Sequence, residues 1–455
     1  MSDPLLKILL ISPNRLNTPC PVYPIGLDYV AGAIPARHEV RIFDFNQEPQ
    51  PDALAASLCE FRPDLVGLSL RNIDNTDGSN SKSFIEDFKG VIATIRTACK
   101  APIVLGGSGF TIFPATLMEV LDADYGIPGD GERISLLLEA LEGNNPVQEI
   151  PGILLRGQTF KQSLTPAVFP MQRQFDIHSP HLQHYLRHSG TMNLQTKRGC
   201  PFHCIYCTYP YIDGARLRPH DPAEVAQTAM ALQKAGAKYI FISDSTFNCS
   251  VQHSTAVAKA FIDIGLSIPW GAFFAPLAIP GDYFKIMAEA GLTHVEFGTE
   301  SLSDKVLTAY KKPFSQRDIF QAHEAALDAG LHVAHYLMLG GPGEDEESLE
   351  ETLASAESLK KSAFFFFCGI RIYPHTALYD IALSEGQISA DQDLLSPVFY
   401  RSGQLTNELI EAKVAAHAAG RMNWVTGSGG DEMEKLLSRM HARGRVGPLW
   451  EHIIP

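Results

Sequence analysis

The stretch "TKRGCPFHCIYCTYP" at residues 196–210 brings together Cys200, Cys204 and Cys207, three of the eight cysteines in a chain of 455 residues. Thiolates are the usual ligands of iron–sulfur clusters, and this spacing lets one loop hold three corners of a cubane cluster. The fourth iron then has no protein ligand. Because an open coordination position is where substrate binds at catalytic metals, the stretch predicts a site of chemistry.

A structural zinc is the alternative, with these cysteines and His203 or a histidine of the linker as ligands. His203 directly precedes Cys204, so both side chains could reach one ion only from a contorted loop, and the chain has no second Cys-x-x-Cys pair. Three incidental thiols are a further alternative. The remaining cysteines are scattered, as buried free thiols usually are, which favours a reducing compartment over a disulfide framework.

The cysteine stretch lies on the first loop of a repeating pattern of strands and helices. Apolar runs predict six strands at 191–196, 238–243, 270–275, 294–298, 332–339 and 363–373, with helical segments between them. Such an alternation fits a β/α barrel or part of one, whose active site lies on the loops after the strand carboxyl ends. We predict a partial (β/α)6 barrel over residues 191–390.

The first 150 residues show the same alternation, with strands predicted at 7–12, 39–45, 64–70 and 101–107. This pattern predicts a doubly wound parallel sheet whose ligand lies beyond the strand carboxyl ends. The loops there read "PIG", "SLRNIDNTDGSN", "GGSGFT" and "IPGDGE". Glycine lets a backbone approach a bulky ligand closely, although ordinary turns also use it. No Gly-x-Gly-x-x-Gly follows the first strand, which disfavours a dinucleotide.

Residues 151–190 contain prolines and polar residues without a long period, and predict a short hairpin and a linker. Residues 391–455 turn helical and predict a small carboxyl-terminal domain that caps the barrel. Arg421, Asn423 and Trp424 in this cap are placed to close over a substrate, or to pack a core as aromatic residues of amphipathic helices do.

Composition and charge disfavour some classes of protein. The chain is 45% hydrophobic and 19% charged, as in ordinary globular proteins. Its formal net charge of -14 disfavours general attraction to nucleic acid. Its apolar runs are shorter than the roughly 20 residues that span a bilayer, so we predict no membrane span and a cytoplasmic protein.

The three cysteines, with Tyr206 before the last of them, resemble the signature of the radical S-adenosylmethionine (SAM) superfamily. The resemblance implies a [4Fe-4S] cluster whose open iron is chelated by the amino and carboxylate groups of SAM. It further implies an electron donor such as a flavodoxin or ferredoxin, because one electron cleaves SAM to an adenosyl radical.

Later loops extend this resemblance to SAM contacts. "SDSTFN" at 243–248 stands where the family has a Gly-Gly-Glu motif or an acidic-polar variant, which makes Asp244 and Ser245 candidates for the methionine ammonium; for Ser245 helix capping is the alternative. "EFGTES" at 296–301 offers Glu300. "LMLGGPGED" at 337–345 and "RIYPHT" at 371–376 offer Gly340 and Tyr373 near the adenine, and Tyr206 completes the set.

The amino-terminal domain resembles that of the cobalamin-binding subgroup of these enzymes. Asp-x-His-x-x-Gly is absent after the first strand, and the first loop contains no histidine, so a bound cobalt would lack a histidine ligand from that loop. A Rossmann-like domain that binds no cobalamin is the alternative, as is a solvated loop position for Arg71. The candidate cobalamin contacts are Gly26, Ser69, Arg71, Gly106, Gly107, Ser108, Gly129, Gly131 and Glu132.

The resemblance implies a cobalamin-dependent methyltransferase that acts on a poorly activated carbon of a small-molecule or peptide substrate. In that mechanism methylcobalamin supplies the methyl group to the substrate, and a second SAM molecule methylates the cobalamin again. Rearrangement or cyclisation without net methyl transfer, and methylation of an electron-rich atom without an adenosyl radical, are alternatives among enzymes. A non-catalytic iron–sulfur or cobalamin sensor is the alternative of another class.

Overall fold

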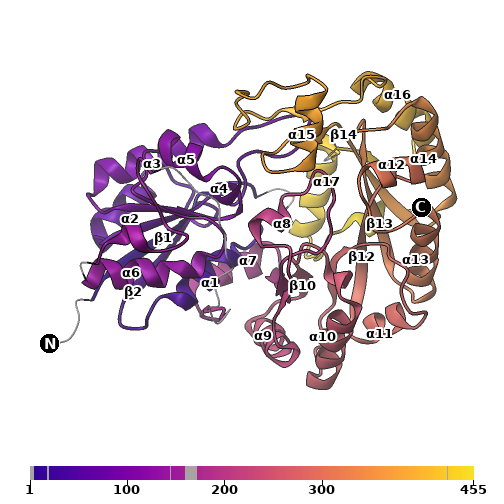
Figure 1. Ribbon diagram of the computed structural model, residues 1–455. Coiled ribbons are helices and arrows are strands. Elements are labelled where there is room, and N and C mark those ends of the chain that lie inside the picture. Colours follow the sequence, from indigo (N-terminus) through magenta and orange to yellow (C-terminus); the bar gives the residue numbers. More distant parts are fainter. Residues whose placement is uncertain (1–4, 18–19, 144, 159–171, 428) are drawn as a thin grey trace.

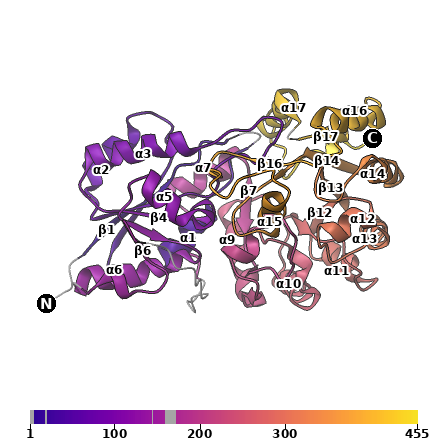
Figure 2. The same ribbon diagram turned by 45° about the horizontal axis from the view of Figure 1, so that its top comes forward.

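A computed structural model describes residues 5–17, 20–143, 145–158, 172–427 and 429–455. The chain forms two α/β lobes that lie side by side in both ribbon views (Figures 1 and 2). The amino-terminal lobe is drawn in indigo and purple, and the lobe that carries the cysteine stretch runs from magenta to yellow. The α/β class and the order of the two predicted units are confirmed.

The amino-terminal sheet has the strand order β2-β1-β3-β4-β5-β6. Its neighbours pair in parallel except β5 and β6, which are antiparallel. This order is the flavodoxin-like doubly wound arrangement, which places a ligand beyond the strand carboxyl ends. The strands are β1 (Lys7–Ser12), β2 (Glu39–Asp44), β3 (Leu65–Ser69), β4 (Ile103–Gly106), β5 (Tyr125–Ile127) and β6 (Leu154–Leu155), and the helices are α1 (Ile25–Ala33), α2 (Ala53–Phe61), α3 (Ile85–Ala98), α4 (Ser108–Ile112), α5 (Pro114–Val120) and α6 (Ile134–Gly143).

The second sheet is an all-parallel partial barrel with the strand order β17-β14-β13-β12-β11-β10-β7. Six of its strands are those predicted: β7 (Thr191–Leu194), β10 (Tyr239–Ile242), β11 (Trp270–Phe274), β12 (Leu292–Glu300), β13 (His332–Leu339) and β14 (Ser362–Cys368). The helices of this lobe are α9 (Pro222–Ala235), α10 (Val251–Ile264), α11 (Tyr283–Glu289), α12 (Asp304–Ala309), α13 (Gln316–Asp328), α14 (Glu346–Ser358) and α15 (Ala377–Ser384).

The local sequence explains where these helices begin and end. Helix α9 begins at Pro222, whose fixed φ suits the first turn, and the Asp221 carboxylate accepts hydrogen bonds from two free amides of that turn. The helix ends at Gly236, which has a φ of 108° that a side chain would strain. The chain can then turn directly into β10.

The structure departs from the predictions in the linker and at the carboxyl terminus. Residues 180–188 form helix α7 (Pro180–His188), and the part of the predicted hairpin at 159–171 lies outside the described residues. Trp424 begins a strand, β17 (Trp424–Thr426), which extends the barrel sheet beside β14. The predicted helical cap is therefore interrupted: α16 (Asn407–Ala418) and α17 (Gly430–Ala442) flank this strand.

One hydrophobic core joins the lobes. Leu70 and Phe110 of the amino-terminal lobe belong to the same buried cluster as Ile205, Tyr310 and Leu378 of the barrel lobe. Side chains this close-packed hold their elements at fixed positions. The loops of the first sheet are therefore held at a set position against the cysteine loop.

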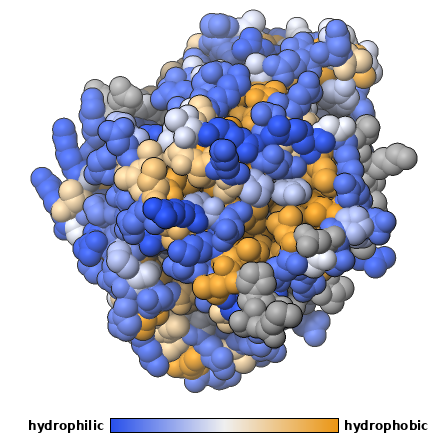
Figure 3. Space-filling model, turned by 90° about the vertical axis from the view of Figure 1, so that its left-hand side faces the viewer, coloured by the Kyte–Doolittle hydropathy of each residue, from blue (hydrophilic) through white to orange (hydrophobic). Residues whose placement is uncertain are grey.

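The outer face of the molecule on the side of the amino-terminal lobe carries apolar patches between charged side chains (Figure 3). Among the described residues, no helix is both long and apolar enough to cross a bilayer.

Candidate active site

The cysteine loop follows β7 and is fixed at its base by a short antiparallel pair, β8 (Lys197–Arg198) with β9 (Arg218–Pro219). The Cys200 amide donates to the Gly214 carbonyl oxygen over 3.1 Å. Gly199 has a φ of 86°, and a Cβ at this position would lie 2.1 Å from the Arg216 carbonyl oxygen. The glycine before the first cysteine is therefore required by the close approach of the two chain segments.

None of the three cysteines is paired in a disulfide; Cys200 is buried, and Cys204 and Cys207 are partly buried. Burial raises the pKa of Cys207 to about 12 and also raises the pKa of Cys204, while the Lys312 ammonium acts in the opposite direction on both. A bound metal cluster would supply the positive charge that thiolates need there. Among the described residues, no three or more His, Cys, Asp or Glu side chains are grouped so that they could hold a single metal ion.

A buried ion pair supports the base of this loop. The Lys197 ammonium donates to Asp244 Oδ2 over 2.6 Å and to the Phe247 carbonyl oxygen over 2.9 Å. The same carboxylate accepts from the Thr196 amide and hydroxyl, at 2.8 and 2.5 Å. Its oxygens are thus already used by residues of the loop. Asp244 was predicted to receive the SAM ammonium, but its contacts are those of a residue that positions the loop.

A second charged cluster lies beside the cysteines. Glu300 Oε1 accepts a hydrogen bond of 2.7 Å from the Tyr206 hydroxyl and one of 3.2 Å from the Lys312 ammonium. Burial disfavours the charged form of Lys312, but Glu300 and Cys204 outweigh it and raise the pKa of the lysine. Burial together with the Glu300 charge raises the pKa of Tyr206 well above its usual range, so this hydroxyl stays a donor. Two predicted SAM contacts, Tyr206 and Glu300, are therefore brought together.

Glu300 has an unusual backbone as well. Its φ is 64°, and the pairing of β12 with β13 shifts register between Gly298 and Glu300. A non-glycine residue in this left-handed region costs free energy and persists only where its surroundings fix it. The two hydrogen bonds to the carboxylate offset this strain. The left-handed backbone conformation turns the carboxylate toward the cysteine loop.

The other predicted SAM contacts lie at successive loops of the barrel. Ser245 lies directly after Asp244, and its hydroxyl is 3.5 Å from the Gly199 carbonyl oxygen that it donates to. Gly340 ends β13 with a φ of 82°, and its amide donates to the buried Glu344 carboxylate. Tyr373 follows β14 and packs against Phe113 of the amino-terminal lobe, with ring centroids 6.3 Å apart.

A cleft with a volume of about 340 Å³ opens between the two lobes, within the size range of ligand pockets. Eight of the nine predicted cobalamin contacts line it, and only Gly106 does not. The cleft is walled on the barrel side by Asn193, Gln195, Ser243, Tyr209 and Asp213, which the sequence reasoning did not select. Their only sequence signal is their place in or near the ends of predicted strands or after the cysteines.

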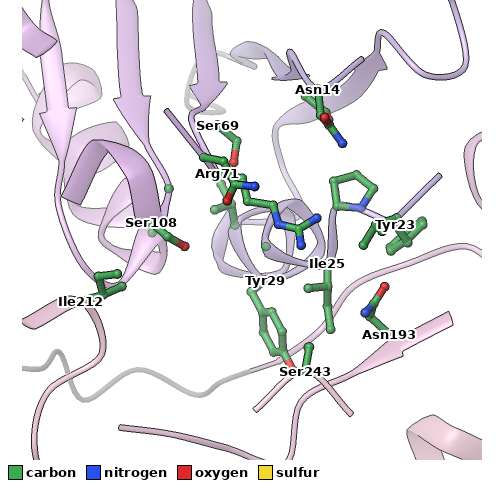
Figure 4. Close-up of a pocket in the computed structure, with 18 of the residues that line it drawn as sticks. Asn14, Tyr23, Ile25, Tyr29, Ser69, Arg71, Ser108, Asn193, Ile212 and Ser243 are labelled. Carbon is green, nitrogen blue, oxygen red and sulfur yellow. The ribbon is translucent and has the colours of Figure 1, made fainter. Parts of the chain in front are cut away.

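Arg71 extends from the end of β3 into the middle of this cleft, where Ser108 lies to one side and Tyr23 and Asn193 to the other (Figure 4). Its guanidinium has no ion-pair or hydrogen-bond partner in the part of the chain that the structure describes. The side chain is exposed to the cleft, and the protein around it lowers the pKa of the guanidinium below its usual value through partial desolvation. An unpaired guanidinium at this place can donate to an acceptor group of a ligand.

Charged residues clamp the lobes together at the edge of the cleft. Arg198 forms ion pairs with Asp130 at 3.0 Å and with Glu132 at 2.7 Å, and Arg218 reaches Asp130 at 2.8 Å. Glu132 lines the cleft, but its carboxylate is bound by an arginine of the barrel lobe. Burial raises the pKa of nearby Asp213 to about 6, against the opposing charge of Arg198.

Comparison with known proteins agrees with this geometry. The family profile for the radical SAM superfamily matches residues 194–356, and the profile for the B12 binding domain matches residues 12–138. The two matches fall on the barrel lobe and the amino-terminal lobe. The chain thus carries a region that matches the radical SAM superfamily behind a region that matches the B12 binding domain.

The proteins that the chain resembles include methyltransferases. The chain is 23% identical to tryptophan 2-C-methyltransferase of Streptomyces laurentii over 82% of this chain and 73% of that protein. It is 26% identical to cytidylyl-2-hydroxyethylphosphonate methyltransferase of Streptomyces wedmorensis, over 79% and 78%. The solved structure of the radical SAM methyltransferase TsrM from Kitasatospora setae superposes with a TM-score of 0.87 at 20% identity, covering 98% of this chain and 97% of that one.

Proposed function

We propose that the chain is a cobalamin-dependent radical SAM methyltransferase, with a small molecule as its substrate. The observation that carries the proposal is the cleft itself, because loops of the B12-binding domain and the residues around the cysteine loop form its two walls. The three cysteines do not line the cleft themselves, but Tyr209 and Asp213 directly after them do, so cofactors bound to the two domains would lie next to the same space. Two reactive centres that share one enclosed space can act on one substrate in turn.

The residues of each wall suit their cofactors. Cys200, Cys204 and Cys207 would hold the [4Fe-4S] cluster, whose bound SAM supplies the adenosyl radical and whose electron comes from a flavodoxin or ferredoxin. Tyr206, Ser245, Glu300, Gly340 and Tyr373 would surround SAM, while Asp244 and Lys197 position the loop beneath it.

On the opposite wall, Gly26, Ser69, Gly107, Ser108, Gly129 and Gly131 allow a flat macrocycle to approach the backbone closely. Arg71 would supply a donor to an acceptor group of cobalamin. Glu132 would act through Arg198, by holding the barrel lobe against this wall. The cluster would draw its electrons from the cytoplasm, where such donors occur.

The first experiment measures the cofactors. Protein purified anaerobically and loaded with iron, sulfide and cobalamin is expected to show iron–sulfur and corrin absorbance together. After reduction, SAM carrying a labelled methyl group is expected to label the protein-bound cobalamin. Corrin binding without any turnover of SAM would instead support a sensor, and 5′-deoxyadenosine without label in any product would support rearrangement or cyclisation.

A matched pair of variants tests the cobalamin wall. Arg71→Met removes the unpaired guanidinium from the cleft, and we expect cobalamin to bind about tenfold more weakly because a charge-assisted hydrogen bond contributes about 1.5–3 kcal/mol. The control is Arg62→Met, which changes an exposed arginine of the same lobe. Equal cobalamin affinity in the two variants would contradict the assignment of Arg71.

A further inference from the structure

One face of the barrel sheet carries a row of aromatic side chains that are incompletely buried. Phe241 of β10, Phe273 of β11, Tyr336 of β13, and Phe365 and Phe367 of β14 form this aromatic row. Phe273 is 39% exposed, whereas its chain neighbours Ala272 and Phe274 are 0% and 1% exposed. Because successive side chains of a strand point to opposite faces, the neighbours pack under the helices and the row faces the interior of the barrel.

The rings form a continuous surface. Phe273 meets Phe241 edge-on at 5.1 Å between ring centroids and Tyr336 edge-on at 6.1 Å. Tyr336 in turn stacks on Phe365 at 4.9 Å. Contacts of this kind give the row a fixed arrangement of ring faces and edges, which suits another aromatic ring better than a saturated one.

The end of the aromatic row that is farther from the cysteine loop, called the lower end below, is closed by other side chains. Glu296 of β12 accepts hydrogen bonds of 3.0 Å from both the Tyr336 hydroxyl and the Trp450 indole N–H. Trp450 packs on Ala334 and Ala363, and α17 covers the same cluster. The buried Glu296 therefore fixes a floor beneath the aromatic row.

The upper end is open and leads to the cysteine loop. Gly298 lies opposite Tyr336 in the sheet, and of the described residues only the Glu300 carboxylate, at 3.3 Å, would meet a Cβ added to it. That carboxylate binds Tyr206, the neighbour of Cys207. A space thus lies over Gly298, with aromatic walls, the floor at Trp450 and the candidate SAM site above it.

We propose that this space binds an aromatic or conjugated planar ring of the substrate. The inference rests on the proposed function, because a substrate must lie within reach of the radical formed at the cysteine loop. The ring faces and edges of Phe273 and Tyr336 bind it, and Gly298 leaves the room for it. The substrate class is therefore a small molecule with an aromatic ring system.

The test compares two neutral probes of one shape class, 2-naphthol and its saturated counterpart decahydro-2-naphthol. Equilibrium dialysis against enzyme loaded with cluster, cobalamin and unreduced SAM is expected to show about tenfold tighter binding of 2-naphthol, as two or three ring contacts would give. Phe273→Leu is expected to remove this preference, and Gly298→Val to weaken 2-naphthol binding at least as strongly by filling the space. Leu383→Ser, an exposed position on α15, serves as the control.

Equal binding of both probes, or an unchanged preference in Phe273→Leu with normal cluster and cobalamin content, would overturn the inference. Those contents, and the unfolding midpoint, show that each variant is folded. Failure of the wild-type enzyme to load cobalamin or to turn over SAM would instead refute the proposed function. The two failures are thus distinguishable.

Discussion

Removal of the Asp244 carboxylate is expected to destabilise the cysteine loop through a buried charge. The Lys197 and Asp244 side chains are 1% and 0% exposed, and their ion pair is 2.6 Å long. In Asp244→Ala the lysine ammonium loses its counter-ion in a place that water does not reach. Breaking a buried pair in this way costs about 3–5 kcal/mol. For a lobe of this size the unfolding midpoint should fall by about 10 °C.

The informative comparison is with the double variant Lys197→Met, Asp244→Leu. Replacing both charges by apolar groups removes the uncompensated ammonium, so most of the lost stability should return. Circular dichroism of the anaerobically reconstituted protein gives the unfolding midpoint, and iron and sulfide analysis gives the cluster content. Cluster content should follow stability across the wild type, the single variant and the double variant.

The opposite pattern would refute this reasoning. If Asp244 were chiefly a ligand of the SAM ammonium, Asp244→Ala would keep its stability and its cluster but lose affinity for SAM, and the double variant would be no better. A midpoint in Asp244→Ala within about 2 °C of the wild type, well short of the expected fall, would show that the ion pair does not hold the loop.

Three other charged sites yield predictions. Lys312→Met leaves the Glu300 carboxylate buried without its cation and should cost about 3 kcal/mol, largely restored by adding Glu300→Gln, as urea unfolding would show. Asp130→Asn removes the shared carboxylate partner of two arginines of the barrel lobe and should speed limited proteolysis of the linker, whereas Asp122→Asn, an exposed carboxylate in the same lobe, should not; equal rates would contradict the clamp. Burial lowers the pKa of His323 to about 4, below the 6.5 of an unfolded histidine, so its share of stability is complete above pH 6.5 and is lost as pH falls toward 4. Urea unfolding between pH 7.5 and 5 should show about 2 kcal/mol of this loss in the wild type and less of it in His323→Gln.

Four strands of the amino-terminal sheet and six of the barrel sheet could be predicted because each is an apolar run bounded by turn residues, whereas β5, with three residues, was not predicted. Apolar runs such as those at 7–12 and 332–339 are long enough to predict a strand from the local sequence alone. The strand β17 escaped prediction because it has only three residues within a helical pattern, and it forms only because β14 offers a free edge beside it. Tertiary pairing of this kind leaves little trace in local sequence.

For the site, the cysteines and Tyr206 could be selected because their spacing is specific to a cluster. Lys197 and Lys312 could not be selected, because the amino-acid sequence does not show that a lysine will be buried beside a carboxylate distant in sequence. The same limit explains why the ion pairs of Glu132 and Asp244 were not predicted. Each was selected for its place on a loop, and each proves to be paired with a cation from elsewhere in the chain.

The core that Leu70 and Phe110 share with Ile205, Tyr310 and Leu378 restricts how this protein can evolve. Most chains of several modules can exchange one of them by recombination at a linker, because few contacts cross the boundary. Here a cut near residue 190 would expose apolar surface on both pieces. The two lobes must therefore change together, and substitutions on one side of the core would select for compensating substitutions on the other.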